Sequence, residues 1–300
     1  MRLALPISIL AALVSARRVP TGMVALLLLT VGAHASSPSE EQLSFDSNGV
    51  TLSGTLVMPA DGAPIAAVVF VHGSGPQQRS TSIAHAFAKE QIAALVYDKR
   101  GVGESGGKYE AKQPVSGPNL ALLADDARAA IDALRRRTET QDLPAGLVGI
   151  SQAGWIVPLA AKGSRASFIV LWSGPVCAVS EEDIFSKYTR DKDLDRVPAF
   201  DEALAAQRRP YRWPAFLGED TNSAQTLASL DIPGLWVFGA KDGSIPVDLS
   251  LARLDALVQS GHAYDYVLFS ALGHNNIPET FLTVTEWIKR AVGNETSIER

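Results

Sequence analysis

The sequence predicts an α/β fold, in which helices cover both faces of a mostly parallel central sheet. Apolar runs such as residues 65–71 and 92–97 are typical of strands that are buried on both faces. Helical patterns alternate with the strands along the chain, and this alternation is typical of parallel sheets. The chain has 300 residues, of which 46% are hydrophobic, so it can form one large domain with a single core.

Each strand and helix of this fold can be assigned to a residue range. Strands are expected at 42–45, 50–58, 65–71, 92–97, 143–148, 168–172, 234–238 and 264–269. The first two alternate apolar and polar residues around a turn, which predicts a hairpin. Helices are expected at 81–90, at 119–137, after residue 154 and at 278–291. The second of these helices has the clearest apolar period of 3.6 residues.

One stretch interrupts the alternation of strands and helices. About sixty residues separate the strand that ends at residue 172 from the strand that begins near 234, far more than a crossover between parallel strands needs. The stretch is mixed in charge and carries several aromatic residues. We therefore expect a helical cap at 176–230, inserted over the C-terminal edge of the sheet. The core then consists of 42–175 and 231–292.

The N-terminal region has the pattern of a secretory signal. Arg17 and Arg18 precede an apolar stretch, and the small residues Ala33 and Ala35 follow it. We expect residues 1–35 to form a signal peptide and the mature protein to be periplasmic or secreted. Neither this stretch nor the apolar stretch at 3–16 reaches about 18 uninterrupted residues, so no stable membrane span is expected after signal removal. A membrane anchor is the alternative.

Composition excludes several classes of function. The net charge of −5 argues against a nucleic-acid partner, which would require a basic face. The single cysteine, Cys177, cannot form an internal disulfide and is interpreted as a small buried residue. No cluster of metal-ligating residue types is found, so we expect neither a metal nor another cofactor. The sequence carries no indication of oligomeric state.

The most informative motif is the run 149–154, Gly-Ile-Ser-Gln-Ala-Gly, between an expected strand and an expected helix. A serine at this place, flanked by very small residues, is typical of a nucleophile elbow. The turn is so tight that the residues two before and two after the serine nearly touch. The serine hydroxyl is then exposed at a helix N-terminus, where backbone N–H groups favour developing negative charge. We therefore predict that Ser151 is a catalytic nucleophile.

A catalytic serine needs a histidine base, and the histidine needs an orienting acid. His274 directly follows the last expected strand, at the sheet edge where the elbow also opens, and is predicted to be the base. The acid should follow a late strand and precede the histidine in sequence, which favours Asp242. Asp248 is the alternative acid, whereas Asp231 precedes its strand and therefore lies at the wrong end of it.

An oxyanion hole needs two hydrogen-bond donors aimed at the tetrahedral oxygen. One is expected to be the backbone N–H of Gln152, directly after the nucleophile. The other is expected to be the N–H of Ser74, in the turn His-Gly-Ser-Gly-Pro at 72–76. The flanking glycines allow the backbone to approach a substrate, although this run taken alone is also typical of an ordinary turn.

Together these motifs resemble the α/β-hydrolase superfamily over roughly residues 42–292. The resemblance is carried by 72–76, by Asp-Lys-Arg-Gly-Val-Gly-Glu-Ser at 98–105, by the elbow, by 239–242 and by 273–274. Bacterial serine carboxylesterases and proline-iminopeptidase-like serine aminopeptidases are the most similar families. Ala153 stands where the G-x-S-x-G pattern has its last glycine, a change that relatives tolerate. The resemblance implies an α/β-hydrolase fold, with 98–105 as a structural turn beneath the site.

The expected activity is the cleavage of carboxylic esters by a Ser-His-Asp acyl-enzyme mechanism, on a small ester or short peptide substrate. One alternative is a secreted serine aminopeptidase, which requires a cap carboxylate to bind the substrate amine. The candidates for that carboxylate are Glu181, Glu182, Asp183, Asp191, Asp193, Asp195, Asp201 and Glu202. Another alternative is a non-catalytic binding protein on a hydrolase fold, since a fold does not determine a function.

Other cap residues have two interpretations each. Arg208 and Arg209 are candidates to bind an acidic substrate, although exposed arginines usually contact only water. The aromatic group around Tyr211 and Trp213 either lines an acyl pocket or packs the cap onto the sheet. Specificity is therefore expected to depend on the cap.

Overall fold

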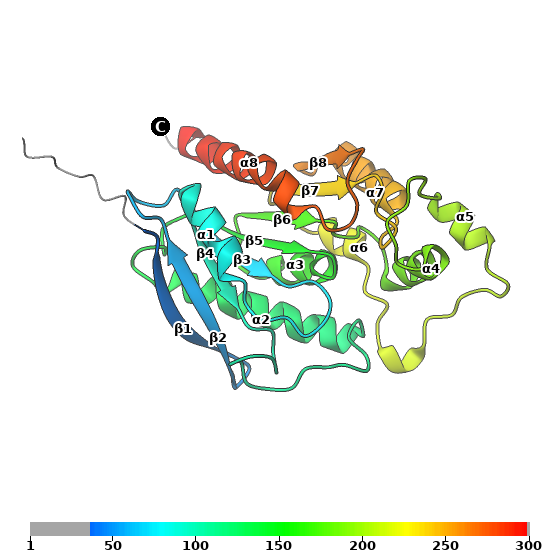
Figure 1. Ribbon diagram of the computed structural model, residues 1–300, viewed down its shortest axis with the longest axis horizontal. Helices are drawn as coiled ribbons and strands as arrows, with labels where there is room; N and C mark the ends of the chain where they lie inside the picture. Colours follow the sequence, from blue (N-terminus) through cyan, green and yellow to red (C-terminus); the bar gives the residue numbers. More distant parts are fainter. Residues whose placement is uncertain (1–36, 299–300) are drawn as a thin grey trace, which may run out of the picture. The chain divides into compact units, whose positions relative to one another are not determined.

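Eight strands form one sheet in the order β1-β2-β4-β3-β5-β6-β7-β8 in the computed structural model, which describes residues 37–298 (Figure 1). The strands are β1 (Ser39–Ser47), β2 (Val50–Met58), β3 (Ala66–Val71), β4 (Ile92–Tyr97), β5 (Ala145–Ile150), β6 (Phe168–Trp172), β7 (Gly234–Gly239) and β8 (Tyr264–Phe269). β1 and β2 form the expected antiparallel hairpin, β2 pairs antiparallel with β4, and the other neighbours are parallel. The expected signal peptide at 1–35 lies outside the described residues.

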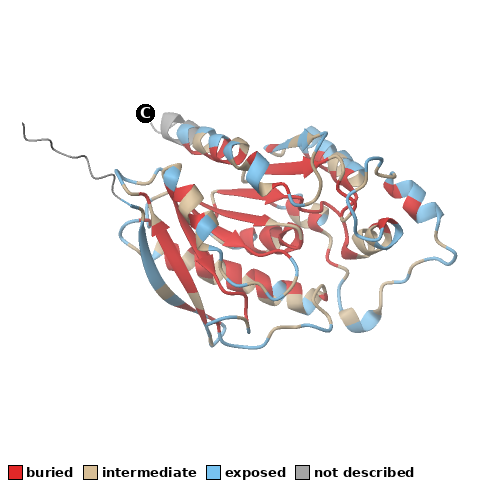
Figure 2. Cartoon of the chain, in the orientation of Figure 1, coloured by how far each residue is buried: buried red, intermediate tan, exposed pale blue. Residues whose placement is uncertain are grey.

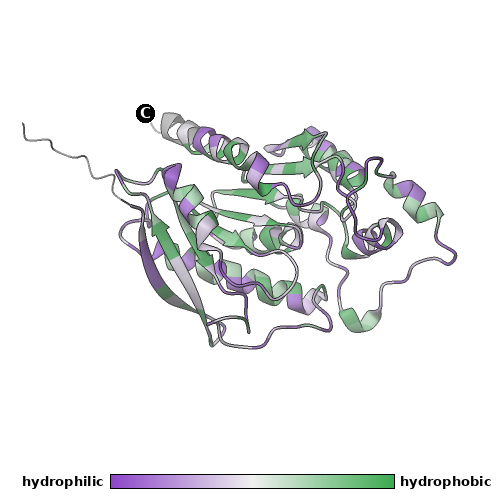
Figure 3. Ribbon diagram, in the orientation of Figure 1, coloured by the Kyte–Doolittle hydropathy of each residue, from purple (hydrophilic) through white to green (hydrophobic). Residues whose placement is uncertain are grey.

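The central strands are buried on both faces, as their uninterrupted apolar sequences predict. Every residue of β3, β4 and β7 is buried, whereas most of β1 is exposed (Figure 2). The same contrast is visible in hydropathy, because β1 is hydrophilic along much of its length (Figure 3). β1 is an edge strand of the sheet, and the exposed charges of Glu40 and Glu41 discourage its pairing with another chain.

Helices cover both faces of the sheet (Figure 1). They are α1 (Thr81–Lys89), α2 (Gly117–Arg135), α3 (Ala153–Ala161), α7 (Val247–Gln259) and α8 (Ile277–Ile298). On one face Phe87 of α1 and Trp287 of α8 belong to an apolar cluster with β-strand residues. On the other face Ile131 of α2 and Leu254 of α7 belong to a second cluster. Within 37–298 no helix combines the length and the apolar character that crossing a bilayer requires.

The register of the parallel strands brings several loops to one edge of the sheet. Ile150 of β5 is paired with Trp172 of β6, and Gly239 of β7 with Phe269 of β8. Each of these strands therefore ends at nearly the same level. The segments that follow β3, β5, β7 and β8 emerge side by side, which is where ligands bind in open α/β sheets.

The segment between β6 and β7 contains four short helices: α4 (Val179–Thr189), α5 (Phe200–Ala205), η1 (Ala215–Leu217) and α6 (Ser223–Leu227). α4 and α5 form a small apolar cluster of their own around Phe185 and Phe200, against which Leu249 of α7 packs. Leu227 of α6 instead belongs to the main core, beside α3. The end of the segment is thus built into the core.

Polar contacts fix this segment to the core. Glu181 of α4 accepts two hydrogen bonds of 2.6 Å from the guanidinium of Arg253 in α7. The Thr189 hydroxyl donates to the carbonyl of Gly243, in the loop after β7. Because these anchors lie at both ends of α4, that helix is held over the C-terminal edge of the sheet.

Candidate active site

Ser151 lies in the tight turn between β5 and α3. Its φ angle is +58°, which is uncommon for a residue with a side chain and requires the surrounding structure to hold it. The Ser151 N–H is fixed by a hydrogen bond of 3.0 Å to the carbonyl of Trp172 on the neighbouring strand. A Cβ atom added at Gly149 would lie 2.5 Å from the Cβ of Ala153. The turn therefore has room for a methyl group at residue 153 or at residue 149 but not at both, so Ala153 is compatible with the turn as long as residue 149 is glycine.

Gly154 has a packing role that the motif alone did not indicate. A Cβ atom there would lie 2.4 Å from Cδ and 2.6 Å from the backbone nitrogen of Pro175, in the loop after β6. Backbone cannot move aside as a flexible side chain can. Gly154 thus permits close contact between the start of α3 and the loop that leads from β6 to the cap segment.

His274 and Asp242 are hydrogen-bonded to each other, with 2.8 Å between Nδ1 and Oδ2. Asp242 is fully buried, and its other oxygen, Oδ1, accepts hydrogen bonds from the N–H groups of Ser244 at 2.8 Å and Ile245 at 3.2 Å. These two bonds leave Oδ2 free to face the histidine. The acid is consequently oriented before any substrate binds.

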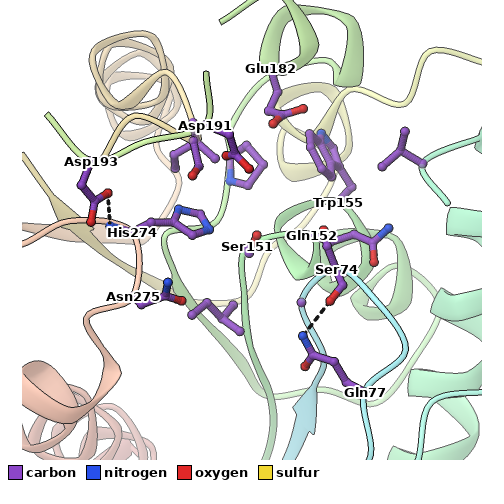
Figure 4. Close-up of a pocket in the computed structure, with 16 residues that line it drawn as sticks. Ser74, Gln77, Ser151, Gln152, Trp155, Glu182, Asp191, Asp193, His274 and Asn275 are labelled. Carbon is purple, nitrogen blue, oxygen red and sulfur yellow. Dashed lines mark hydrogen bonds between the residues drawn. The ribbon is translucent and has the colours of Figure 1, made fainter. Parts of the chain in front are cut away.

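The His274 ring points toward Ser151 across the pocket (Figure 4). No hydrogen bond joins the Ser151 hydroxyl to His274 in the described part of the chain, and such bonds often tighten only when substrate is bound. Burial lowers the pKa of His274, but the hydrogen bond to Asp242 and the charges of Asp242, Asp191 and Asp193 outweigh it, so the pKa lies above its usual 6.5. A carboxylate-paired histidine of raised pKa is suited to accept a proton.

The other described histidines are engaged elsewhere. His72 is buried, with Nε2 2.5 Å from the carbonyl of Tyr97, and burial and the charge of Lys99 lower its pKa to about 4. His85 pairs with Glu40, and Nδ1 of His262 lies 3.0 Å from the carbonyl of Leu230. None of these three lines the pocket around Ser151.

The alternative acids are also engaged elsewhere. Asp248 accepts a hydrogen bond of 2.9 Å from the N–H of Phe200 and so anchors α5 of the cap segment to α7. Asp231 is exposed at the opposite end of β7 from His274. Neither lines the pocket around Ser151.

Ser74 and Gln152 both line the pocket beside Ser151, opposite His274 (Figure 4). Gln152 is the N-cap residue directly before α3, where backbone N–H groups have no partner within the helix. Among the described residues, neither the Ser74 nor the Gln152 backbone N–H donates a hydrogen bond. The Ser74 carbonyl accepts one of 2.7 Å from Gln77, which helps to fix the turn. The two donors are thus available to an oxyanion.

Comparison with known proteins gives the same fold. Residues 62–190 match the model of a family described as serine aminopeptidase, S33. An esterase from Pyrococcus furiosus is similar in structure, with a TM-score of 0.63 at 17% identity, covering 85% of this chain and 92% of its own. A dienelactone hydrolase from Anabaena variabilis has a TM-score of 0.55 at 18% identity, covering 85% of this chain and 99% of its own.

An acylaminoacyl peptidase from Pyrococcus horikoshii has a TM-score of 0.63 at 17% identity; the match covers 86% of this chain but 42% of that one. No curated protein sequence matches significantly. These similarities show that the chain has the α/β-hydrolase fold. The expected fold, with its mostly parallel sheet and helices on both faces, is therefore confirmed.

The pocket around Ser151 has a volume of about 450 Å³ and is closed on one side by acidic residues of the cap segment. Of the eight carboxylates proposed from the sequence, Glu182, Asp191 and Asp193 line it (Figure 4). Asp193 also accepts a hydrogen bond of 2.9 Å from the N–H of His274. Burial, together with the charges of Asp183 and Asp191, raises the pKa of Glu182 to about 8. Asp191 and Asp193 therefore supply the negative charge on the cap side of the pocket, and Glu182 adds to it only as the pH approaches 8.

The remaining candidate cap residues lie elsewhere. Glu181, Asp183 and Asp195 pair with Arg253, Lys187 and Lys241 respectively. Arg208, Arg209, Tyr211 and Trp213 line a separate pocket of about 550 Å³. Trp213 also packs against the main core, which supports the packing interpretation of the aromatic group.

Two further pocket features escaped the sequence interpretation. Trp155 of α3 lines the pocket, and its indole N–H donates to the Cys177 carbonyl at 2.8 Å. Cys177 itself is buried, as expected.

Lys99 in the turn at 98–105 contacts both segments of the expected oxyanion hole. The rest of that turn is structural, because Asp98 accepts hydrogen bonds from the N–H groups of Arg79 and Glu104. Within 37–298 no group of three His, Cys, Asp or Glu residues is placed to hold a metal ion.

Proposed function

We propose that this protein is a serine hydrolase that cleaves carboxylic esters through an acyl-enzyme intermediate. The observation that supports it best is the pair His274–Asp242, at 2.8 Å, beside a serine in the strained elbow conformation. Ser151, His274 and Asp242 follow β5, β8 and β7, so the sheet register brings them together. The esterase and dienelactone hydrolase folds named above are consistent with ester substrates.

The mechanism has two steps. His274 takes the proton of the Ser151 hydroxyl as its oxygen attacks the ester carbonyl, and the N–H groups of Gln152 and Ser74 stabilise the oxyanion. The tetrahedral intermediate collapses, the acyl–oxygen bond breaks, and the alkoxide leaves as an alcohol with the proton from His274. In the second step His274 activates water, which attacks the acyl-enzyme and releases the acid and free Ser151. Asp242 holds the tautomer of His274 throughout.

Covalent labelling of the serine tests this proposal directly. A fluorophosphonate probe should label the wild-type protein and fail to label Ser151→Ala, and this variant should lose ester hydrolysis by roughly four or more orders of magnitude. Ser164→Ala, which removes a hydroxyl in the loop before β6, is the matched control and should behave as wild type. Labelling that survives in Ser151→Ala would contradict the proposal. A protein that neither reacts with the probe nor hydrolyses esters would favour the non-catalytic alternative.

A second candidate is a serine aminopeptidase, favoured by the carboxylates on the cap side of the pocket. A substrate ammonium group in the pocket would face Glu182, Asp191 and Asp193 while the scissile carbonyl lies at Ser151. The two candidates share their chemistry and differ in the leaving group and in the charge of the acyl portion. Chromogenic esters of rising chain length, assayed beside prolyl and other aminoacyl amides, distinguish them. Faster cleavage of the amides would replace the ester proposal by the aminopeptidase.

We also propose that the protein is exported, with residues 1–35 removed as a signal peptide. The support is the sequence pattern of Arg17 and Arg18, the apolar stretch and Ala33-His34-Ala35. Expression of the full chain in a bacterial host, followed by fractionation and N-terminal sequencing, tests it. A mature chain that begins at Ser36 in the periplasm or medium is expected. An uncleaved chain retained in the membrane fraction would instead indicate an anchor.

A further inference from the structure

Lys99 occupies an unusual place at the end of β4. Its side chain is almost completely buried, with 3% of the residue exposed. The ammonium group donates three hydrogen bonds: 2.8 Å to the Gly73 carbonyl, 3.2 Å to the Gly75 carbonyl and 2.9 Å to Oε1 of Gln152. An ammonium group has three N–H bonds, so its donors are all used.

The three acceptors belong to the two segments that carry the oxyanion donors. Gly73 and Gly75 flank Ser74, so the ammonium group fixes the carbonyls on both sides of that residue. Gln152 supplies the second donor from its backbone, and its side-chain amide is also held by a hydrogen bond of 2.8 Å to the Pro114 carbonyl. Lys99 is therefore the direct link between the turn after β3 and the start of α3.

The positive charge of Lys99 is not neutralised by an ion pair within the described residues. The carboxylate of Asp98 next to it accepts hydrogen bonds from Arg79 and Glu104. His72 is neutral at pH 7, and the ring of Tyr109 lies 5.9 Å from the ammonium nitrogen. Burial lowers the pKa of Lys99 to about 8. A buried cation without an anionic partner costs free energy, and an oxyanion that develops nearby lowers that cost.

We propose that Lys99 is the positioning residue of the oxyanion hole: it holds the Ser74 and Gln152 N–H donors in place and keeps an uncompensated positive charge directly behind the two segments that carry them. This inference rests on the proposed serine hydrolase function. The proposed role of Lys99 differs from the structural role expected for the turn at 98–105, because a structural role requires the hydrogen bonds of Lys99 and not its charge. The charge acts in the transition state, where the carbonyl oxygen becomes negative, and much less on the neutral substrate.

Kinetics of two substitutions test the role of Lys99. Lys99→Met keeps the apolar stem and removes the donors and the charge, whereas Lys99→Arg keeps the charge. On a neutral p-nitrophenyl ester, Lys99→Met should lower kcat by about 100-fold and change KM by less than about threefold, as loss of oxyanion stabilisation does. Lys99→Arg should recover at least tenfold over Lys99→Met. Lys162→Met, which removes an exposed lysine after α3, is the matched control and should match wild type.

Binding of a transition-state analogue separates this role from a general loss of structure. A trifluoromethyl ketone forms a tetrahedral adduct with a negative oxygen, so its affinity for Lys99→Met should fall by the same factor as kcat/KM. The thermal midpoint of each variant shows whether it is folded. A folded Lys99→Met variant with kcat within threefold of wild type would overturn the inference. Loss of kcat without loss of analogue affinity would overturn it too.

The pH profile provides a test without any substitution at residue 99. Lys99 is charged below a pKa of about 8 and neutral above it, so kcat should fall as pH rises through that value. Glu182 titrates in the same range, so the profile is measured with a neutral ester in a Glu182→Gln background. A kcat that stays level to pH 10 would overturn the inference. Active-site labelling of Ser151 distinguishes the outcomes: if labelling persists while these tests fail, the proposed hydrolase function stands and only the role of Lys99 is wrong.

Discussion

The two sides of the pocket around Ser151 are built in different ways. On the sheet side, Ser151 directly follows β5, and Asp242 and His274 lie in the loops after β7 and β8. Asp242 is fully buried and held by backbone N–H groups. On the cap side, Asp191 and Asp193 are exposed and come from the loop after α4. The sheet side thus has the rigidity that chemistry requires, whereas the cap side presents charge to whatever enters. The comparison suggests that the sheet determines the reaction and the cap selects the substrate.

The largest expected effect is on the sheet side, from Asp242→Asn. The two N–H groups that hold Oδ1 select the amide oxygen for that position, so the NH₂ group must face His274. The histidine then accepts at Nδ1 and is protonated at Nε2, the tautomer that cannot take a proton from Ser151. We expect kcat for a neutral ester to fall by about 10³–10⁴-fold.

Asp248→Asn is the matched control for this prediction. Its oxygen can still accept the hydrogen bond from the Phe200 N–H, so activity should stay within about threefold of wild type. A larger loss in Asp248→Asn than in Asp242→Asn would mean that Asp248, and not Asp242, is the orienting acid.

A smaller effect is expected where the two sides meet, at Gly154. The added methyl group of Gly154→Ala would lie 2.6 Å from the Pro175 nitrogen, so the backbone of α3 or of the loop after β6 must shift. We expect the free energy of unfolding to fall by about 1–3 kcal/mol, measured by urea denaturation. Gly293→Ala, where a Cβ would meet nothing within 4 Å, is the control and should not destabilise the protein. Equal stability of both variants would show that the contact with Pro175 is loose.

The sheet side was largely predictable from the sequence because it depends on local patterns. Uninterrupted apolar runs identified the buried strands, and the small residues around Ser151 identified the tight turn. Parallel strands with equal register place the residues after their carboxyl ends side by side. The positions of Asp242 and His274 after late strands were therefore enough to predict that the two residues meet at the edge where Ser151 lies.

The cap side was not predictable because its geometry depends on individual backbone angles and on contacts distant in sequence. Arg190 and Asp191 both have left-handed φ angles, of 61° and 56°, and this turn at the end of α4 directs the following acidic residues to the pocket. Positive φ angles are uncommon for residues other than glycine, and although Asp is enriched there, the residue type alone does not identify the position. Lys99 escaped notice for a related reason, since its three acceptors come from β-strand and helix ends 24–53 positions away.

The cap side should discriminate substrates by charge, through Glu182. A choline ester and its neutral 3,3-dimethylbutyl isostere differ in charge and hardly in shape. Above a pKa of about 8 Glu182 is ionised, so Glu182→Gln should lower the choline preference in kcat/KM by about tenfold at pH 9 and very little at pH 6. Glu202→Gln removes a cap carboxylate that does not line the pocket and serves as the control. An unchanged preference at pH 9 would show that the acidic side does not contact the leaving group.

The smallest effect expected is a displacement of the acid limb of the pH profile by Asp193→Asn. The charge of Asp193 contributes to the raised pKa of His274, and the amide oxygen of asparagine can still accept the hydrogen bond from the His274 N–H. The substitution therefore removes charge and keeps the contact. His274 must be neutral to act as a base, so activity rises with pH through its pKa. Removing a carboxylate lowers that pKa, and the limb of kcat/KM for a neutral ester should move to lower pH.

Asp195→Asn is the control for this displacement, because Asp195 is exposed and pairs with Lys241 without contributing to the His274 pKa. An acid limb that moves equally in both variants would reflect net charge rather than the local contact. A limb that stays in place in Asp193→Asn would mean that the cap exerts no electrostatic influence on the catalytic base. In that case the two sides of the pocket act independently, and the cap affects only which substrate binds and not how fast the base works.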